Sequence, residues 1–390
     1  MSKWKETEFG KIPIEWALKK IIELKSPDKS AIAMGPFGSN IRAENFVPNG
    51  VPVIRGTNFN FDKYVGGEFV FLNDEKADEL KGSNCKPGDL VFTHRGTIGQ
   101  VAIIPKGKYS RYVISQSGMK LTVNENKINN EFLFYFFKSK VGQYQLLKNE
   151  AQVGVPSISN PLTTLKDLGV PVPEISEQIQ IASILSSLDN KIDLLHRQNK
   201  TLEALSETLF RQWFVEEAEE SWEVGKLGDL VNVKYGKDHK KLIEGNIPVY
   251  GSGGIMRYAD TALYSSESVL VPRKGTLNNI VYTDEPFWTV DTMFYTVMNK
   301  PNLAKFVYIY LKGQDLASMN VGSAVPSMTT DILNNMILNI PPDIILEKFE
   351  IETLPLYYKI KSNTIQIRTL TQLRDTLLPK LMSGEVRVKN

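Results

Sequence analysis

The sequence predicts a mixed α/β protein with an internal pseudo-twofold repeat. Two globular α/β domains are separated by two long helices that pair as an antiparallel coiled coil. Three observations lead to this fold. Five segments recur in the same order, short apolar runs bounded by turn residues precede each long helix, and two heptad stripes occupy matched positions. The 390 residues are enough for two or three domains.

The repeat is visible as pairs of similar segments. The pairs are EWALKKIIEL (15–24) with SWEVGKLGDL (221–230), VPV (51–53) with IPV (247–249), RGTIG (95–99) with KGTLN (274–278), GVPSI (154–158) with AVPSM (324–328), and LEALSETL (202–209) with LTQLRDTL (370–377). The offset falls steadily from 206 at Trp16 and Trp222 to 168 at Thr208 and Thr376. A falling offset indicates one ancestral unit used twice, with the second copy trimmed. Two copies of a site on one chain suggest a two-part target.

The order of elements follows from local patterns, and it divides the chain into a first domain (1–173), a first long helix (174–216), a second domain (217–342) and a second long helix with a tail (343–390). Strands are predicted at VPVIRG, DLVFTHRG, QVAIIP and MKLTV in the first copy and at IPVYGSGG, SVLVPRKG, NIVY and MFYTVM in the second. A helix is predicted after the strands of each copy, at 130–148 and at 302–312.

Each long helix carries an apolar seam with alternating spacings of four and three residues, as in a coiled coil. The seam residues are Ile181, Leu185, Leu188, Ile192, Leu195, Asn199, Leu202 and Leu205 on the first helix and Ile360, Asn363, Ile367, Leu370 and Leu377 on the second. Placing Asn199 opposite Asn363 makes paired residue numbers add to 562 and gives the neighbouring seam positions apolar partners. Pro355 is expected to kink the second helix or to start a new segment. The alternative interpretation is two ordinary buried helix faces.

The composition excludes several classes of protein. The net charge is only +2, so a nucleic-acid surface has to be local, and the single cysteine, Cys85, allows no internal disulfide. No signal sequence or membrane span is recognised, and we expect a cytoplasmic protein. There is no P-loop, and His94, His196 and His239 lie too far apart in sequence to suggest a metal site. No nucleophile has a partnered base, and the sequence therefore predicts a binding protein without catalytic residues, metal or cofactor of its own.

The binding candidates are cationic, amide-bearing, hydroxyl and imidazole residues in predicted loops, because such side chains pair with phosphates and base edges. They are Arg42, Asn45, Arg55, Asn58, His94, Arg95, Thr97, Arg111 and Gln116 in the first copy and Lys237, His239, Lys240, Arg257, Arg273, Lys274, Thr276 and Asn278 in the second. Arg95 and Lys274 precede a Gly-Thr pair in both copies, which favours a phosphate contact at that turn. The alternative for each residue is a solvated loop charge, or a turn that only requires glycine.

Several of these motifs resemble a known family. GPFGSNI (35–41), GVPVIRG (50–56), PGDLVFTHRGTIG (87–99) and VPVPEISEQIQIASILSSLDNKI (170–192) are similar to the specificity (S) subunit of type I restriction–modification systems. IPVYGSGGIMRY (247–258) and VLVPRKGT (269–276) resemble another branch of the same domain family.

The resemblance implies two target-recognition domains, each reading half of a bipartite double-stranded DNA site. It also implies that the long helices act as a spacer and dock two methyltransferase subunits. Those subunits and the restriction subunits would bind S-adenosylmethionine, ATP and Mg²⁺. The second helix departs from this pattern, because Thr353, Pro355 and Asn363 weaken its seam. Two alternatives remain open: a self-contained DNA modification enzyme, and a coiled-coil adaptor without a DNA role.

Overall fold

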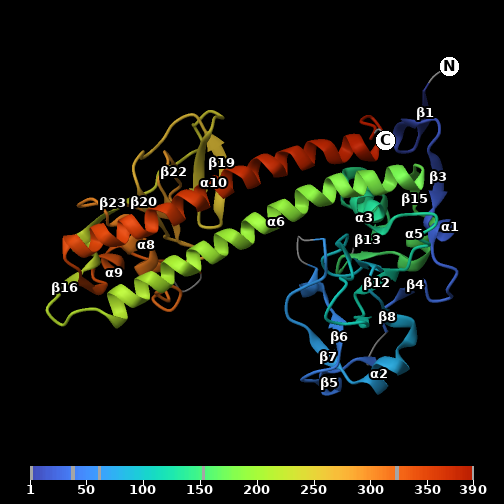
Figure 1. Cartoon of the computed structure of the whole chain (residues 1–390), viewed down its shortest axis with the longest axis horizontal. Coiled ribbons are helices and arrows are strands. Elements are labelled where there is room, and N and C mark those ends of the chain that lie inside the picture. The colour runs from blue at the N-terminus through green and yellow to red at the C-terminus, as the bar shows by residue number, and fades with distance from the viewer. Residues whose placement is uncertain (1–2, 37–39, 60–62, 152–153, 321–324, 389–390) are drawn as a thin grey trace. The chain divides into compact units, whose positions relative to one another are not determined.

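The computed structural model describes residues 3–36, 40–59, 63–151, 154–320 and 325–388, so that residues 37–39 of the GPFGSNI motif lie outside the description. The chain forms two compact units, residues 1–193 with 367–390 (unit 1) and residues 194–366 (unit 2). Two long helices, α6 (Ile175–Arg211) and α10 (Asp343–Met382), contribute to both units (Figure 1). The prediction of two long helices, each following an α/β domain, is confirmed.

Besides its parts of the long helices, the described part of unit 1 contains twenty short strands and α-helices. They are β1 (Trp4–Thr7), β2 (Gly10–Pro13), β3 (Ala17–Lys20), α1 (Ile21–Leu24), β4 (Ile32–Met34), β5 (Phe46–Val47), β6 (Val51–Ile54), β7 (Val70–Leu72), α2 (Asp74–Glu79), β8 (Asn84–Cys85), β9 (Leu90–Thr93), β10 (Val101–Ile103), β11 (Tyr112–Ile114), β12 (Gly118–Leu121), α3 (Asn130–Lys138), α4 (Lys140–Leu147), β13 (Glu150–Ala151), β14 (Ser157–Ile158), α5 (Pro161–Asp167) and β15 (Gly169–Val172), counted over the described residues. The two main sheets have the strand orders β10-β9-β12-β4 and β5-β7-β6-β11-β8.

Unit 2 is built from fewer elements. They are β16 (Glu223–Lys226), α7 (Leu227–Leu230), β17 (Val231–Tyr235), β18 (Ile247–Gly251), β19 (Gly254–Ala259), β20 (Ser268–Pro272), β21 (Val281–Thr283), β22 (Trp288–Thr289), β23 (Met293–Met298), α8 (Ala304–Lys312), α9 (Thr330–Asn334) and β24 (Ile337–Ile340). Its sheets have the orders β21-β20-β23-β17, β19-β18-β22 and β16-β24.

The two units share one topology, which confirms the internal repeat. The order β10-β9-β12-β4 in unit 1 matches β21-β20-β23-β17 in unit 2, strand for strand along the chain. The parallel pair β6–β11 matches the parallel pair β18–β22, and β3–β15 matches β16–β24. The trimming falls beside the second sheet, where unit 1 has β7, α2 and β8 between matched strands and unit 2 has only the β18–β19 hairpin.

The helix predicted at 130–148 is two helices, α3 and α4, which meet at Ser139. Ser139 has an extended backbone, and its hydroxyl accepts a hydrogen bond from the Gly142 amide at 3.1 Å, so it caps α4. Gly142 is required here, because a Cβ at this position would lie 2.0 Å from the Phe136 carbonyl oxygen. The apolar periodicity continues across the break, which is why the sequence pattern predicted one helix.

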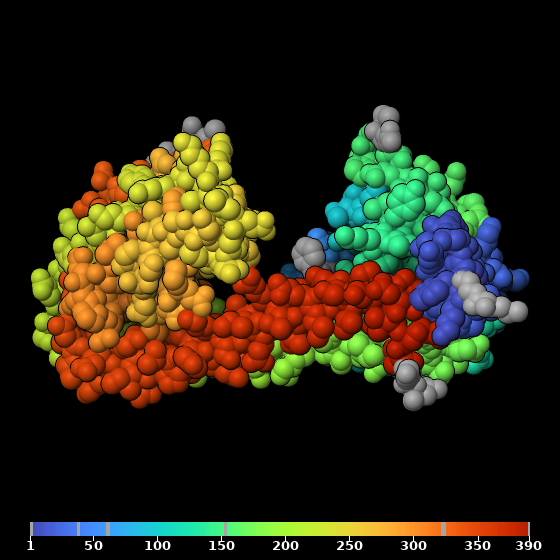
Figure 2. Space-filling model, turned by 90° about the horizontal axis from the view of Figure 1, so that it is seen from above, coloured from blue at the N-terminus to red at the C-terminus, as the bar shows by residue number. Residues whose placement is uncertain are grey.

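The matched tryptophans belong to the two cores, but among the described residues only one of them has a hydrogen-bond acceptor. The Trp16 indole donates to Glu177 at 3.2 Å, and Arg387 also binds Glu177, at 2.6 Å. The C-terminal end of α10 and the tail therefore lie against the N-terminal residues of unit 1, as Figure 2 shows in red and blue. In unit 2 the Trp222 indole nitrogen is buried without a partner among the described residues. Ile345 occupies the position that Glu177 has in unit 1.

In both units α6 and α10 pack antiparallel and in the predicted register. In unit 2 the Asn363 amide donates to the Asn199 side-chain oxygen at 2.8 Å, which confirms the pairing of these two residues. In unit 1 the Asp189 carboxylate accepts a hydrogen bond from Arg374 at 3.0 Å. These two residue numbers add to 563, one more than the predicted sum of 562. The seam residues Ile181, Leu185, Ile192, Leu195 and Asn363 are buried, while Leu188, Asn199, Leu202, Ile360, Ile367, Leu370 and Leu377 are half-buried.

Helix α10 continues through Pro355, so the expectation that a new segment starts there is wrong, while a kink at Pro355 stays a prediction. Pro355 is exposed, so the carbonyl that loses its hydrogen bond faces water. The seam assignment of Leu205 is also wrong. Leu205 is 46% exposed, and Ser206 takes its place in the interior, where its hydroxyl bonds Tyr357 at 3.4 Å. No described helix is both long and apolar enough to cross a membrane.

Candidate functional site

A turn with the same geometry occurs in both units and contains the matched cations. Arg95, Gly96 and Thr97 follow β9, and Lys274, Gly275 and Thr276 follow β20; all but Gly275, which is half-buried, are exposed. Gly96 and Gly275 have φ values of +82° and +89°, which explains why glycine stands at both positions. The turn therefore presents a cation and a hydroxyl to solvent twice in one chain.

A second segment fixes the position of each turn. The Gly96 amide donates to the Pro156 carbonyl at 2.9 Å, and the Gly275 amide donates to the Pro326 carbonyl at 3.0 Å. Isolated bridges pair Arg95 with Ser157 and Lys274 with Ser327. The recurring Val-Pro-Ser segments, residues 155–157 and 325–327, thus support the two cationic turns. We refer to each turn together with its Val-Pro-Ser segment as a recognition turn: residues 95–97 with 155–157, and residues 274–276 with 325–327.

Further loops gather around the recognition turn of unit 1. The Gln100 amide donates to the Phe59 carbonyl at 3.1 Å, which ties the loop after β6 to this region. The His94 ring bonds the Gln116 carbonyl at 3.1 Å, which ties in the β11–β12 connection. Gln116 itself is exposed. The loop that begins at Arg55, the recognition turn and the loop at Gln116 therefore lie next to one another.

The recognition turn of unit 2 has a comparable setting. The Asn279 amide donates to the Ser252 carbonyl at 2.8 Å, so the tip of the β18–β19 hairpin lies beside the turn. The Arg273 guanidinium lies over the Tyr235 ring at 5.4 Å and donates to the Asp291 carbonyl at 3.1 Å. Tyr235 is 53% exposed. Two cations and an aromatic ring beside the hairpin tip form a combination suited to a polyanion with planar bases.

Three candidates of unit 1 have structural roles instead. Asn58 is fully buried, accepts from the Arg55 amide at 2.9 Å and donates to the Gly66 and Glu68 carbonyls, so its polar atoms are all engaged. His94 is buried, and that burial lowers the pKa of its imidazole, which disfavours a cation there. The Arg111 guanidinium is occupied by Asp74 and Asp78. Their contacts within the protein account for these three residues, and the prediction that they contact a ligand stays untested.

The remaining candidates divide between local contacts and open surface. Asn278 accepts from the Ala317 amide at 3.0 Å, and Arg257 donates to the Leu242 carbonyl at 3.0 Å, so both have local roles. The Asn45 side chain accepts a hydrogen bond from the backbone amide of Arg42. The guanidinium of Arg42 lies 3.5 Å from the Glu44 carboxylate. His239 is half-buried, and Lys237 and Lys240 are exposed on the loop after β17. Arg55 is half-buried, and its Nε has no partner in the described part of the chain.

Sequence reasoning missed two sets of apolar residues. Val155 and Val325, in the recognition turns, are 56% and 54% exposed. One face of α10 in unit 2 carries a heptad stripe of exposed residues: Ile344, Ile351, Leu354, Tyr358 and Ile365, all more than 50% exposed. We call this set the α10 stripe. Its spacing of seven, three, four and seven residues was visible in the sequence, but the stronger seam on the opposite face concealed it.

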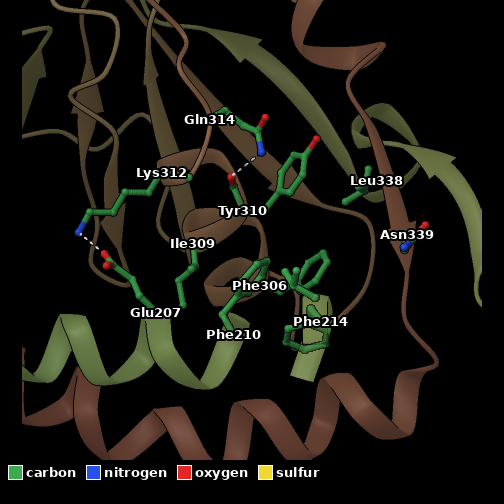
Figure 3. A pocket seen from close by; sticks show the side chains of 12 residues that line it. Glu207, Phe210, Phe214, Phe306, Ile309, Tyr310, Lys312, Gln314, Leu338 and Asn339 are labelled. Atoms are coloured by element: carbon green, nitrogen blue, oxygen red, sulfur yellow. Dashed lines mark hydrogen bonds and ion pairs between the residues drawn. The ribbon is translucent and has the colours of Figure 1, made fainter. Parts of the chain in front are cut away.

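A pocket of about 560 Å³ opens in unit 2 between the end of α6, α8 and β24 (Figure 3). Phe210, Phe214 and Phe306 form its apolar wall, and Lys312 bonds Glu207 at one edge, 3.0 Å away. In unit 1 the chain forms α4 after the equivalent helix, whereas after α8 it makes only turns. No nucleophile with a base lines this pocket, so its described residues show no reaction site. Nor do the described residues contain a cluster of three metal-ligating side chains.

Comparison with known proteins shows which family shares this sequence pattern. The family model described as the type I restriction modification DNA specificity domain matches residues 25–204 and again residues 219–366. The MjaIX type I restriction enzyme specificity subunit of Methanocaldococcus jannaschii is 26% identical, over 100% of this chain and 97% of that protein. The HindI specificity subunit of Haemophilus influenzae is 22% identical, over 92% of this chain and 100% of that protein.

A solved structure shows the same fold. The type I restriction–modification S subunit from M. genitalium superimposes with a TM-score of 0.62 at 19% identity, covering 94% of this chain and 96% of that chain. Because the family model matches most of the chain in two copies, one for each repeat, the protein belongs to the type I restriction–modification DNA specificity family, whose members are the non-catalytic specificity subunits of these systems.

Proposed function

We propose that this chain reads a bipartite double-stranded DNA target, with each unit contacting one half of it. The observation that carries the proposal is the recognition turn, which is built twice with the same backbone hydrogen bonds and a cation at the same place. An exposed cation beside an exposed threonine hydroxyl suits a phosphate, while the surrounding loops reach base edges. The net charge of +2 is compatible with such local surfaces.

The experiment is a binding titration of the purified chain with random duplex DNA at several salt concentrations. Specific and nonspecific binding through phosphates should weaken as salt rises, with a log–log slope of roughly −0.9 for each neutralised phosphate. A chain that binds no duplex at any salt concentration, while still binding partner proteins, would instead be an adaptor. Methyl transfer by the purified chain with S-adenosylmethionine alone would contradict the assignment of catalysis to other subunits.

We further propose that the helices dock two methyltransferase subunits, that restriction subunits join this assembly, and that S-adenosylmethionine, ATP and Mg²⁺ bind to those partners. The α10 stripe supports a docking role, because five large apolar side chains at heptad spacing form a face to which another amphipathic helix can pack. The family assignment supports a subunit of the modification complex as the partner rather than an unrelated helix.

The two long helices are unequal at equivalent positions. The repeat offset of 168 places Ser183 and Asn190 of α6, both exposed, where the α10 stripe has Ile351 and Tyr358. We therefore expect one methyltransferase subunit to dock mainly through apolar contacts on α10 and the other through a more polar surface on α6. The first should bind more tightly.

A matched pair of double variants tests this. Ile351→Glu with Tyr358→Glu should reduce the complex from two methyltransferase subunits per chain to one, as measured by native mass spectrometry. Ser183→Glu with Asn190→Glu is the control at the equivalent positions of α6 and should leave the tighter site occupied. If the α10 variant still binds two subunits with unchanged affinity, the α10 stripe is not the docking face.

A further inference from the structure

Each recognition turn ends in an exposed apolar tip that the cation cannot explain. Val155 is followed by Pro156, and Val325 is followed by Pro326, and all four residues are exposed. The next two residues repeat the same pattern, a half-buried serine and then a buried apolar residue, Ile158 or Met328. The two tips therefore have the same sequence, the same exposure and the same hydrogen-bonded support.

Folding alone accounts for the serine and the buried residue but not for the valine. Ser157 and Ser327 pair with the cationic turns, and Ile158 and Met328 belong to the cores of their units. Proline holds the preceding residue in an extended conformation, so the valine side chain is presented by a stiff segment. Val155 and Val325 are more than half exposed, so their side chains contribute little to either core. A polar residue would serve equally well at a solvated loop tip.

The position of the tip specifies what it can contact. Its proline carbonyl accepts a hydrogen bond from the glycine amide of the cationic turn, at 2.9 Å in unit 1 and 3.0 Å in unit 2. A phosphate bound at Arg95 or Lys274 would thus bring the Val-Pro tip against the same duplex. An apolar side chain gains nothing from a phosphate, whereas the 5-methyl group of thymine is an apolar group displayed in the major groove.

We propose that Val155 and Val325 are specificity-determining residues that each contact a thymine methyl group, one in each half of the DNA target. This inference rests on the proposed function and adds to it a division of labour within each recognition turn. The cation holds the backbone, and the neighbouring valine distinguishes thymine from the other bases.

The test begins with selection of bound duplexes from a random pool by the wild-type chain assembled with its modification subunits. Each thymine of the selected target is then replaced by uracil, which removes only the 5-methyl group. Binding should weaken about threefold to fivefold at one thymine of each half, as expected for the loss of one buried methyl contact. Val155→Ser should abolish the uracil effect in one half only, and Val325→Ser should abolish it in the other half only.

Two controls and one comparison keep the outcomes distinct. Val141 and Val224 are exposed valines outside the recognition turns, so Val141→Ser and Val224→Ser should retain both uracil effects. The salt slope should stay unchanged in Val155→Ser and Val325→Ser, because no phosphate contact is lost. If wild-type protein shows no uracil effect, or if both serine variants keep it, the inference is overturned while the proposed function stands. If the wild-type assembly selects no DNA sequence, the proposed function fails and the inference fails with it.

Discussion

The hydrogen bond between Asn199 and Asn363 should fix the register of the helices at a cost in stability. Asn363 is completely buried, and its amide donates to Asn199 at 2.8 Å, but its own side-chain oxygen has no partner among the described residues. An unpartnered buried polar atom costs about 1–3 kcal/mol. Replacing both residues by leucine removes this cost and adds apolar burial, which outweighs one lost hydrogen bond of about 0.5–1.5 kcal/mol.

The net gain for Asn199→Leu with Asn363→Leu is therefore about 1–3 kcal/mol. Both residues lie in unit 2, which spans residues 194–366. For a unit of this size, 1 kcal/mol shifts the unfolding midpoint by about 2–4 °C, so we expect the Tm of unit 2 to rise by about 2–12 °C. Asn199→Leu alone should do the opposite, because it removes the main acceptor of the Asn363 amide and lowers stability by about 1–3 kcal/mol.

Differential scanning calorimetry of the wild type, both single variants and the double variant measures these shifts as a double-mutant cycle. Opposite signs for Asn199→Leu and the double variant are the expected result. A double variant that unfolds at a lower temperature than either single variant would refute the reasoning, because the paired amides would then contribute net stability.

Three other predictions concern charges. Arg95→Ala and Lys274→Ala should each lower the salt slope of DNA binding by about 1 and weaken all sequences about equally, whereas an unchanged slope in fluorescence titrations would remove these residues from the phosphate contacts. Lys305 is 1% exposed and lies 3.1 Å from Glu267 and 2.5 Å from Glu350, so Lys305→Ala should destabilise unit 2 by about 3–5 kcal/mol in urea unfolding, and a loss below 1 kcal/mol would contradict the buried pairing. Burial alone would raise the pKa of Glu131, but hydrogen bonds from Ser186 and Lys63 lower it below its ordinary value of 4.5. The stability that Glu131 contributes is thus present above pH 4.5 and lost as the pH falls through the lower folded value, so Glu131→Gln should flatten the decline of the urea midpoint below pH 4.5, and parallel curves would contradict this.

The fold was largely readable from the sequence because each of its signals was repeated. The offset between Trp16 and Trp222, and between Thr208 and Thr376, defined two copies before any element was assigned. The same symmetry means that choosing one pair of facing residues sets the register of the whole helix pair. Choosing Asn199 opposite Asn363 gave the register that the structure shows. A new segment at Pro355 was expected because the sequence pattern does not show that packing on the opposite face keeps the helix continuous there.

The candidate site was less readable, because residue type does not distinguish a contact made within the protein from one left open. Asn58 and His94 belong to types that bind nucleic acids, yet in this chain they hold loops together. Val155 and Val325 were visible only as part of the repeat, since an apolar residue in a loop predicts burial until its exposure is known. Residues that stand at the same place in both copies of the repeat, such as Arg95 and Lys274, identified the exposed turns better than residue type did.

The central claim is that each unit reads one half of a bipartite DNA target. Sequencing of methylated bases in DNA modified by the assembled complex tests it directly, with wild-type protein and with a variant whose recognition surface in unit 2, residues 251–256 and 274–278, is replaced. The account predicts two short specified blocks separated by unspecified bases in the wild type, and a change in one block only in the variant. A single continuous motif, or a variant that alters both blocks, would contradict it.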